Sequence, residues 1–425
     1  MFANKLRNSE FIKSVSILMT GTVIAQAVSY SFYPFITRLY SPEEMGDLGV
    51  FIRVVSFISI LATLRYEYTF PIIKNLQQAF LLYRSTLRIA VIVCLSSFVF
   101  GICYVLLFSS SHINVLLILV TSITAFTAAW INSGTLWAIR MKLFKQISFQ
   151  KISNSLAVNT LRYIFGIFAF GSFGLIIATC LGYIISSVTF IRVFLKENLK
   201  YQKYISKKKT MVLLKNHKEF PLVNLPHSAL EIGNDLLVAM LILYHYDKEH
   251  FGFYSFAYLM LRLPLMIIGQ SFGQVFFSRC SDLINNKKVI LPFFQKNAFY
   301  LLVIGSLPFT ILYFFGPTLF GFIFGNRWFF SGEVASIFSI AMFVNFIVSP
   351  LSTISLVLSR QKEVFFLGLI VVLSQLFVFG VIPILINIEF LNLLWINTTV
   401  LSILYLVAYF YYISFIRKYE HGLII

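Results

Sequence analysis

Charged residues are scarce in this sequence, and acidic residues are the scarcest of them. Only 12% of the 425 residues are charged, and 16 acidic side chains stand against 34 lysines and arginines. A typical soluble domain has about 25% charged residues. This chain has too little charge for a surface that faces water on all sides, which argues against a soluble globular protein.

Cysteine is also rare, with four residues in the whole chain. Cys94, Cys103 and Cys180 lie within long apolar stretches, and Cys280 lies at the end of another. No two of them have the spacing of metal ligands, and isolated cysteines usually act as small apolar packing residues. We therefore expect neither a bound metal nor another cofactor.

Long apolar stretches fill most of the sequence, in which 59% of the residues are hydrophobic and 17% are aromatic. A helix needs about 20 apolar residues to cross the hydrocarbon core of a membrane, whereas membrane strands show about ten residues of alternating polarity. The pattern predicts an all-α integral membrane protein with about 12 transmembrane helices. We place these helices at 15–37, 48–73, 86–108, 113–138, 151–170, 174–195, 219–244, 252–278, 291–316, 331–358, 363–386 and 391–415.

Positive charge is concentrated in every second connection between the predicted helices. The longest basic connection, 196–218, holds eight lysines, whereas the connections 109–112 and 171–174 have no lysine or arginine. Loops rich in lysine and arginine stay on the cytoplasmic side of a membrane. We therefore predict an even number of crossings with both termini in the cytoplasm. This topology explains the net charge of +18, which gives no support for a nucleic-acid partner.

A short motif is repeated in the two halves of the chain. The pattern Tyr-x-x-Glu-x-x-Gly follows the first predicted helix at 40–46 and the seventh at 246–252, an offset of 206 residues. Because the basic connection 196–218 divides the copies, we predict six-helix lobes at 1–195 and 219–425, joined by this cytoplasmic linker. Transporters built from lobes repeated in the same orientation hold substrate between them and open alternately to each side.

Three ionisable residues form a stripe on the seventh predicted helix. His227, Glu231 and Asp235 recur every four residues and so share one helix face. Such groups serve as proton relays in membrane pumps, and partial burial raises the pKa of a carboxyl group. We predict a role in ion coupling or in lining a cavity. In the alternative, the first two lie near the wet cytoplasmic end, and only Asp235 lies deep enough to pair with an arginine.

The repeat relates this stripe to a different set of residues in the first helix. Subtracting 206 from each position gives Gly21, Ala25 and Ser29, which are also spaced by four. Small side chains at that spacing favour close packing between membrane helices. The sequence therefore predicts that the two lobes are unequal, with the titratable groups in the second.

A segment near the amino terminus resembles the signature of a known family. The run 34–46, Pro-Phe-Ile-Thr-Arg-Leu-Tyr-Ser-Pro-Glu-Glu-Met-Gly, followed by Arg65-Tyr66-Glu67 before Pro71, is similar to that of Wzx-type polysaccharide flippases. These belong to the multidrug/oligosaccharidyl-lipid/polysaccharide (MOP) superfamily, whose MATE-like fold has two six-helix lobes. Beyond these residues, the resemblance depends on chain length, the predicted helices and the repeat.

The resemblance implies a flippase of the bacterial inner membrane that acts by alternating access. Its substrate would be undecaprenyl-diphosphate-linked O-antigen or capsule repeat units, moved from the cytoplasmic to the periplasmic leaflet. Coupling to protons or other cations has been proposed for relatives. The implied partners are this lipid-linked glycan and the bilayer, and a polysaccharide polymerase and a chain-length regulator are further candidates.

Arginines within the predicted helices are candidates for binding the diphosphate, because a guanidinium group forms paired, charge-assisted bonds with phosphate and stays charged when buried. Arg53 and Arg262 lie on one face of the second and eighth helices, at similar distances after the two motif copies, and Arg162 lies in the fifth. An ion pair with an acidic residue of the seventh helix is the alternative for the first two. We expect Arg65 and Glu67, on different faces near the end of the second helix, to be structural.

Three other functions agree less well with the sequence. A multidrug or cation antiporter of the same superfamily would share the fold but would favour acidic cavities without several buried arginines. A membrane glycosyltransferase or polymerase would need a large external domain or long external loops, and the longest external connection here is near 316–331. A passive channel would not need two lobes around a central site. The enzyme classes are therefore disfavoured.

Overall fold

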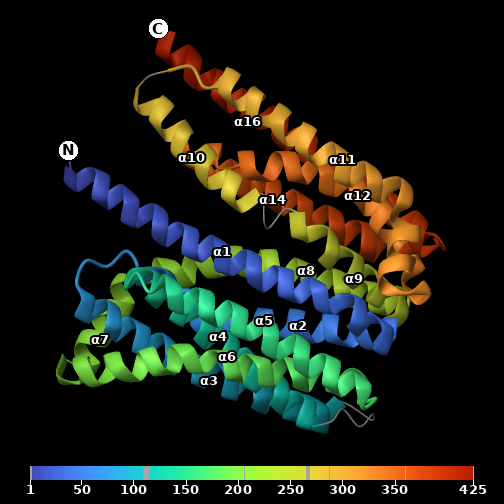
Figure 1. Ribbon diagram of the computed structural model, residues 1–425, viewed down its shortest axis with the longest axis horizontal. Helices are drawn as coiled ribbons and strands as arrows, with labels where there is room; N and C mark the ends of the chain where they lie inside the picture. Colours follow the sequence, from blue (N-terminus) through green and yellow to red (C-terminus); the bar gives the residue numbers. More distant parts are fainter. Residues whose placement is uncertain are drawn as a thin grey trace. The chain divides into compact units, whose positions relative to one another are not determined.

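The computed structural model is helical throughout the residues that it describes, and no strand occurs among them (Figure 1). The described residues are 2–108, 115–204, 206–264, 269–286, 288–358 and 360–424. The first helices along the chain are α1 (Phe2–Leu39), α2 (Pro42–Thr63), α3 (Leu76–Phe108), α4 (Val115–Arg140), α5 (Phe144–Ile167), α6 (Gly171–Tyr201) and α7 (Lys207–Asn216). They are followed by α8 (Leu225–His245), α9 (Lys248–Pro264), α10 (Gln270–Asn285), α11 (Leu291–Phe324), α12 (Phe329–Leu351), α13 (Ile354–Val357), α14 (Gln361–Leu376), α15 (Ile382–Leu385) and α16 (Phe390–Ile424). The predicted all-α fold class is confirmed.

Most of these helices have the length and composition of membrane spans. Eight stretches of the described residues are long and apolar enough to cross a membrane. They correspond to α2, α3, α4, α6, α11, α12 with α13, α14 with α15, and α16. The remaining predicted spans also fall in helices, namely α1, α5, α8, and α9 with α10. The chain is therefore a multi-pass membrane protein.

Several predicted spans are interrupted where a single helix was expected. The second was predicted to continue to residue 73, but α2 ends at Thr63, because the next two residues adopt left-handed conformations. In the tenth, α12 ends one residue after Pro350, which has no N–H to continue the helical bonds. In the eleventh, a π-turn at Phe377–Val381 separates α14 from α15.

The chain forms two compact units whose boundaries do not follow the order of the sequence. The first unit contains Met1–Tyr40 and Asp47–Leu236, and the second contains Ser41–Gly46 and Leu237–Ile425. The first turn of α2 therefore packs with the second unit, while the rest of α2 packs with the first. In the same way, α8 contributes its first half to one unit and its second half to the other.

The predicted linker at 196–218 is not an extended loop. Helix α6 continues to Tyr201, a 3-10 turn covers Gln202–Tyr204, and α7 fills most of what remains. Helix α7 is part of the first compact unit. The division into functional lobes at 1–195 and 219–425 stays a prediction.

The first unit is organised around α5, which packs against α1 and α6 (Figure 1). A Cβ atom on Gly21 of α1 would lie 2.9 Å from the Cα of Ser148 on α5. Further along the same face, the hydroxyls of Ser29 and Ser155 are 2.8 Å apart, and Ser155 also donates to the carbonyl of Ala25. The predicted role of the small-residue stripe in close helix packing is confirmed.

The second unit is organised around α12, which packs against α9, α11 and α16. Glycines allow α11 and α12 to approach closely, since a Cβ atom on Gly316 would lie 2.7 Å from the carbonyl oxygen of Gly332. Aromatic rings fill the space between α9 and its neighbours, where Phe256 packs against Phe324 and Trp328.

Within the second unit, the two copies of the repeated motif meet in a reciprocal contact. A Cβ atom on Gly46 would lie 2.6 Å from the carbonyl oxygen of Lys248, and one on Gly252 would overlap the carbonyl oxygen of Pro42. Position 248 is related to 42, and 252 to 46, by the same offset of 206. The first turns of α2 and α9 therefore pack as symmetry-related partners, which supports the repeat inferred from the sequence.

Candidate functional site

A strained turn after α2 places an arginine side chain inside the first unit. Leu64 and Arg65 have φ angles of 49° and 61°, in the left-handed region that non-glycine residues rarely adopt. The backbone N–H of Arg65 faces the hydroxyl of Thr63 at 3.4 Å, and a 3-10 turn at Tyr66–Thr69 follows. Such conformations persist where the surroundings hold them, and they are frequent at functional sites. The turn directs Arg65 away from the continuing path of α2.

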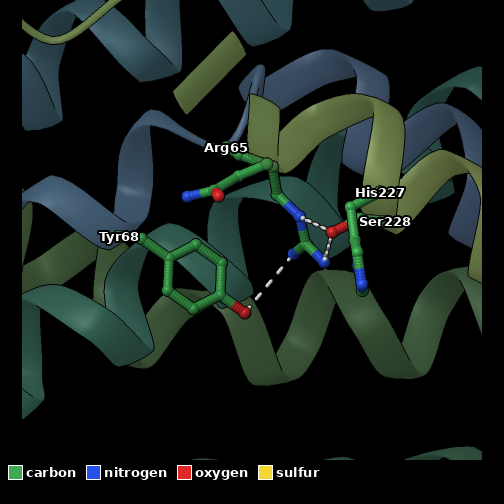
Figure 2. A pocket seen from close by; sticks show the side chains of 5 residues that line it. Arg65, Tyr68, His227 and Ser228 are labelled. Atoms are coloured by element: carbon green, nitrogen blue, oxygen red, sulfur yellow. Dashed lines mark hydrogen bonds between the residues drawn. The ribbon is translucent and has the colours of Figure 1, made fainter. Parts of the chain in front are cut away.

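The guanidinium group of Arg65 bonds to the first turns of α8. Nε and Nη2 donate to the hydroxyl oxygen of Ser228 at 2.9 and 2.6 Å, and Nη1 lies 3.4 Å from the hydroxyl of Tyr68. The guanidinium carbon lies 5.0 Å from the centre of the Tyr68 ring. Figure 2 shows the guanidinium directed at Ser228, with Tyr68 on one side and His227 next to Ser228. Ser228 lies 163 positions after Arg65 in the chain.

A buried carboxyl group lies beside this arginine. Glu67 Oε1 is 3.5 Å from Nη1 of Arg65. Its Oε2 is buried and has no hydrogen-bond partner in the part of the chain that the structure describes. Burial raises the pKa of Glu67 above its ordinary value of 4.5, although a hydrogen bond from Thr63 and the positive charge of Arg65 act in the opposite direction. Arg65 therefore has a weak internal counter-ion at its side.

These side chains surround a small polar cavity. Arg65, Tyr68, Asn224, His227 and Ser228 line a space of about 160 Å³ in the first unit. Asn224 reaches it from the end of a π-turn, Phe220–Asn224, that leads into α8. Sites for drug-sized ligands are about 300–1,000 Å³, so this cavity is suited to a compact anionic group and is too small for an oligosaccharide.

Two neighbouring helices hold the turn in place. Arg140, the last residue of α4, donates from Nη1 to the carbonyl of Phe70 at 2.7 Å and from Nη2 to the carbonyl of Lys74 at 3.1 Å. On the other side, the hydroxyl of Tyr66 donates to the carbonyl of Leu214 on α7 at 3.1 Å. The cavity is therefore built on a turn that is bonded to a side chain of α4 and to a backbone carbonyl of α7.

The arginines predicted to bind a diphosphate lie elsewhere in the chain. Arg53, on α2 in the first unit, is half-buried and donates from Nη1 to the carbonyl of Gly49 at 3.0 Å. Arg262, near the end of α9 in the second unit, is exposed, and its guanidinium lies 4.8 Å from the centre of the Tyr258 ring. Their role in binding stays a prediction.

Arg162 is part of the packing between α5 and α6. It is only 6% exposed, and its Nε and Nη2 donate to the hydroxyl of Thr179 at 3.3 and 2.9 Å. Its carbonyl accepts a hydrogen bond of 2.8 Å from the hydroxyl of Tyr40. In this conformation Arg162 joins α5 to α6 and to Tyr40, the residue that follows α1, and its predicted contact with substrate stays untested.

The ionisable stripe of α8 extends away from the cavity. His227 is exposed and contributes to the cavity wall beside Arg65. Glu231 is also exposed, one turn further along, and Asp235 is half-buried. The prediction that one face of α8 presents these three groups agrees with these positions, and their role in ion coupling stays a prediction.

The sequence reasoning treated Arg65 as structural and gave no role to Tyr68, Asn224 or Ser228. The expectation that Arg65 and Glu67 lie on different faces of one helix was wrong, because the helix ends before both of them. One available signal was the position of Arg65 within the motif that resembles the family signature. Another was the pair of small polar residues that flank His227 at the start of α8.

Solved structures show the same fold over almost the whole chain. They include an inward-facing MATE-family multidrug resistance transporter of the MOP superfamily, with 12% identity, 94% of this chain and 99% of that chain covered, and a TM-score of 0.68. The lipid II flippase MurJ in an inward closed conformation has 14% identity, coverage of 96% and 90%, and a TM-score of 0.70. A MOP superfamily transporter from Pyrococcus furiosus has 13% identity, coverage of 96% and 96%, and a TM-score of 0.59. At these identities the likeness shows the fold alone.

Sequence comparison identifies the family. No curated protein sequence matches the chain, but a family model described as "Polysaccharide biosynthesis protein" matches residues 35–333, which is more than half of the chain. Together with the MOP-superfamily fold, this match confirms the resemblance to polysaccharide flippases drawn from segment 34–46. The chain therefore belongs to the family of polysaccharide biosynthesis proteins.

Proposed function

We propose that this protein moves undecaprenyl-diphosphate-linked oligosaccharide units from the cytoplasmic to the periplasmic leaflet of a bacterial inner membrane. Membership of the polysaccharide biosynthesis family and a fold similar to that of a lipid II flippase support this function. The Arg65 cavity is the observation that connects this function with particular residues. A diphosphate must leave water to cross about 30 Å of hydrocarbon, so the protein has to supply fixed positive charge along the way.

The Arg65 cavity fits a phosphate group in size and chemistry. The guanidinium stays charged when buried, and its donors are held in a fork by bonds to a single hydroxyl oxygen, that of Ser228. Phosphate oxygens would replace this neutral acceptor with a charge-assisted, bidentate one. Asn224 and Tyr68 offer further donors at the cavity wall. The oligosaccharide and the polyprenyl chain would remain outside this space.

Arg53, Arg262 and Arg162 are proposed as further positions for the diphosphate along its path. Arg53 and Arg262 are each accessible to some degree. Arg162 would first have to leave Thr179, to which it donates two bonds. In alternating access, each arginine would be used at a different stage, and Arg65 would bind the headgroup first, from the side where the basic connections lie.

The stripe on α8 is proposed to couple transport to a proton gradient. His227 shares the Arg65 cavity, so a change in its charge would act directly on a bound anion. Glu231 and Asp235 continue the stripe along α8 at intervals of one turn. Replacing both with Gln and Asn should remove the response of transport to an imposed pH gradient, and an unchanged response would show that these carboxylates do not carry the coupling.

Gene deletion with complementation tests the function. The deletion strain should lose long-chain surface polysaccharide and should accumulate lipid-linked precursor in the inner leaflet. Arg65→Ala should fail to restore the polysaccharide, and Arg65→Lys should restore it in part, since lysine keeps the charge without the fork. Arg327→Ala, at an exposed position after α11, is the matched control and should complement fully.

Three outcomes would contradict the proposal or the part of it that concerns Arg65. Normal surface polysaccharide in the deletion strain, with no accumulated precursor, would exclude the flippase function. Loss of drug or cation export in that strain would instead support an antiporter of the same superfamily. Full complementation by Arg65→Ala, at an expression level matched to the parent protein, would leave the flippase function intact but would remove Arg65 from it.

A further inference from the structure

Helix α7 follows α6 and precedes α8 along the chain, and it packs within the first unit. Its Leu213 and Leu214 pack against a buried aromatic cluster that includes Phe80 and Trp137. The carbonyl of Leu214 also accepts the hydrogen bond from Tyr66 in the turn that carries Arg65. These contacts hold one face of α7 against the unit, and the side chains on the opposite face are exposed in the part of the chain that the structure describes.

The outward face of α7 combines basic and apolar side chains. At about 100° per residue, positions 208, 211, 212 and 215 lie opposite the two packed leucines. Lys208 and Lys215 are exposed, as are Met211, at 62%, and Val212, at 54%. An apolar pair between two lysines is unfavourable in contact with bulk water. It is the composition of a helix that lies in the interface of a membrane.

The packing partners of α7 place it at the ends of two apolar spans. Leu213 and Leu214 pack against Phe80, near the start of the span Leu76–Leu107, and Trp137, near the end of the span Val115–Arg140. The ends of spans lie near the headgroup layer, which extends about 5–8 Å beyond the hydrocarbon core on each side. Helix α7 therefore lies beside the place where these two spans leave the membrane.

The charge of the segment identifies the kind of lipid. Residues 196–218 contain eight lysines and one acidic residue, Glu197. On α7 itself, Lys207, Lys208, Lys209 and Lys215 are all exposed. Lysines this close to a membrane surface are attracted to acidic headgroups and not to zwitterionic ones. Charge complementarity therefore selects an acidic phospholipid as the partner.

We propose that the outward face of α7 docks on acidic phospholipid headgroups, with Lys208 and Lys215 contacting phosphate and Met211 and Val212 inserted between the lipids. This contact would hold α7 in the plane of the membrane. Because Tyr66 bonds to α7 and neighbours Arg65, the docked helix would also steady the turn that forms the cavity. The proposal concerns the supporting bilayer and does not depend on which substrate is transported.

Hydrogen–deuterium exchange on the full-length protein tests this docking. The protein is placed in nanodiscs of phosphatidylcholine alone, or of equal parts phosphatidylcholine and phosphatidylglycerol, and exchange is followed in the peptide that covers 206–218. Exchange across α7 should slow several-fold in the acidic discs. High salt should reverse much of the difference, because ions screen the lysines from the headgroups.

Matched variants separate this docking from a general effect of charge. Lys208→Gln with Lys215→Gln should abolish the difference between the two kinds of disc. Lys142→Gln with Lys145→Gln, at exposed positions before α5 and in its first turn, should leave it unchanged. Met211→Ser with Val212→Ser should reduce the protection and make the remainder more sensitive to salt. Exchange at the end of α4 provides the check that each variant is folded.

Three results would overturn the proposal. Equal exchange of α7 in the two kinds of disc would show that acidic lipid is not the partner. Equal loss of protection in the control pair would show that total charge, and not this face, determines the response. Protection that appears only when a soluble protein is added would identify a protein partner in place of the lipid.

Discussion

The repeat offset of 206 relates three positions on α1 to three positions on α8, and the two sets differ in burial. The set on α1 is packed against another helix, and the set on α8 is mostly exposed. On α1, the face formed by Gly21, Ala25 and Ser29 is packed against α5, with hydroxyl and carbonyl groups of the two helices bonded to each other. On α8, the equivalent positions are His227, Glu231 and Asp235. The first two of these are exposed and the third is half-buried.

The difference shows how one scaffold can be divided between support and function. Small residues on α1 allow backbones to approach, and the resulting contact fixes the first unit. Ionisable residues on α8 are incompatible with such an approach, because burying them without partners would be strongly unfavourable. Ionisable groups on an exposed face lie where ligands and protons can reach them. The two helices therefore differ in the side chains at related positions, and both positions lie on helices of the same predicted repeat.

Exchanging residues between the two helices should break the comparison most strongly. Ala25 is 8% exposed and is related to the exposed Glu231 by the repeat offset. Ala25→Glu would bury an unpaired carboxylate between α1 and α5, at a cost of about 3 kcal/mol or more. Glu231→Ala should change stability by no more than about 0.5 kcal/mol. Thermal unfolding in detergent measures both, and equal effects would contradict the assignment of one face to packing and the other to solvent.

The contact between motif copies should show a smaller but clear effect, at the place where the halves are most alike. A Cβ atom on Gly252 would lie 2.6 Å from the carbonyl carbon of Pro42, so one backbone would have to move. Gly252→Ala should lower stability by about 2 kcal/mol. Gly368→Ala is the control, since nothing lies within 4 Å of the added atom. Unfolding temperatures that match between the two variants would refute the close contact.

Hydrogen bonds between α1 and α5 should contribute less than the packing itself. Ser155→Ala removes the bonds to the carbonyl of Ala25, at 2.7 Å, and to the hydroxyl of Ser29, at 2.8 Å. Bonds of this kind in membrane proteins contribute about 0.6 kcal/mol each, so we expect a loss near 1 kcal/mol. Ser31→Ala, which removes a bond within α1 on its exposed side, is the matched control. A larger loss in the control would mean that the α1–α5 network adds nothing.

Local patterns predicted much of this fold. Apolar stretches long enough to cross a membrane identify helices without knowledge of their neighbours, and every predicted span contains helix. The stripe of Gly21, Ala25 and Ser29 predicted close packing, because small side chains on one face allow another helix to approach it. The contact between the motif copies at 40–46 and 246–252 supports the predicted repeat, although their three identities gave no sign that the copies would touch each other.

Local sequence patterns could not predict most of the candidate site. Arg65 belongs to an apolar stretch that predicts a continuous helix. The left-handed turn at 64–65 contains no glycine, so the sequence gives no signal of it. Its partner Ser228 lies in a different helix, 163 positions later. Arg162 was predicted as a candidate for diphosphate contact, and its bonds to Thr179 on the neighbouring helix could not be read from the sequence. Contacts between distant segments decided the environment of both arginines.

The pH dependence of stability tests the buried carboxyl group of Glu67. Burial raises the pKa of Glu67 above 4.5, so the folded protein holds this proton more tightly than the unfolded chain does. The stabilising contribution is therefore complete below pH 4.5 and is lost as the pH rises through the folded pKa. Each unit of displacement corresponds to about 1.4 kcal/mol, and the charge of Arg65 opposes the displacement by favouring the charged form.

Glu67→Gln isolates this contribution, because an amide of similar shape cannot ionise. Relative to the variant, the parent protein should become less stable as the pH is raised from 4.5 through the folded pKa of Glu67. The difference in unfolding temperature between the parent protein and Glu67→Gln could also stay constant from pH 4.5 upward. In that case Glu67 is already ionised in the folded protein at pH 4.5. Arg65 would then be held by a full negative charge, and an incoming phosphate would have to displace it.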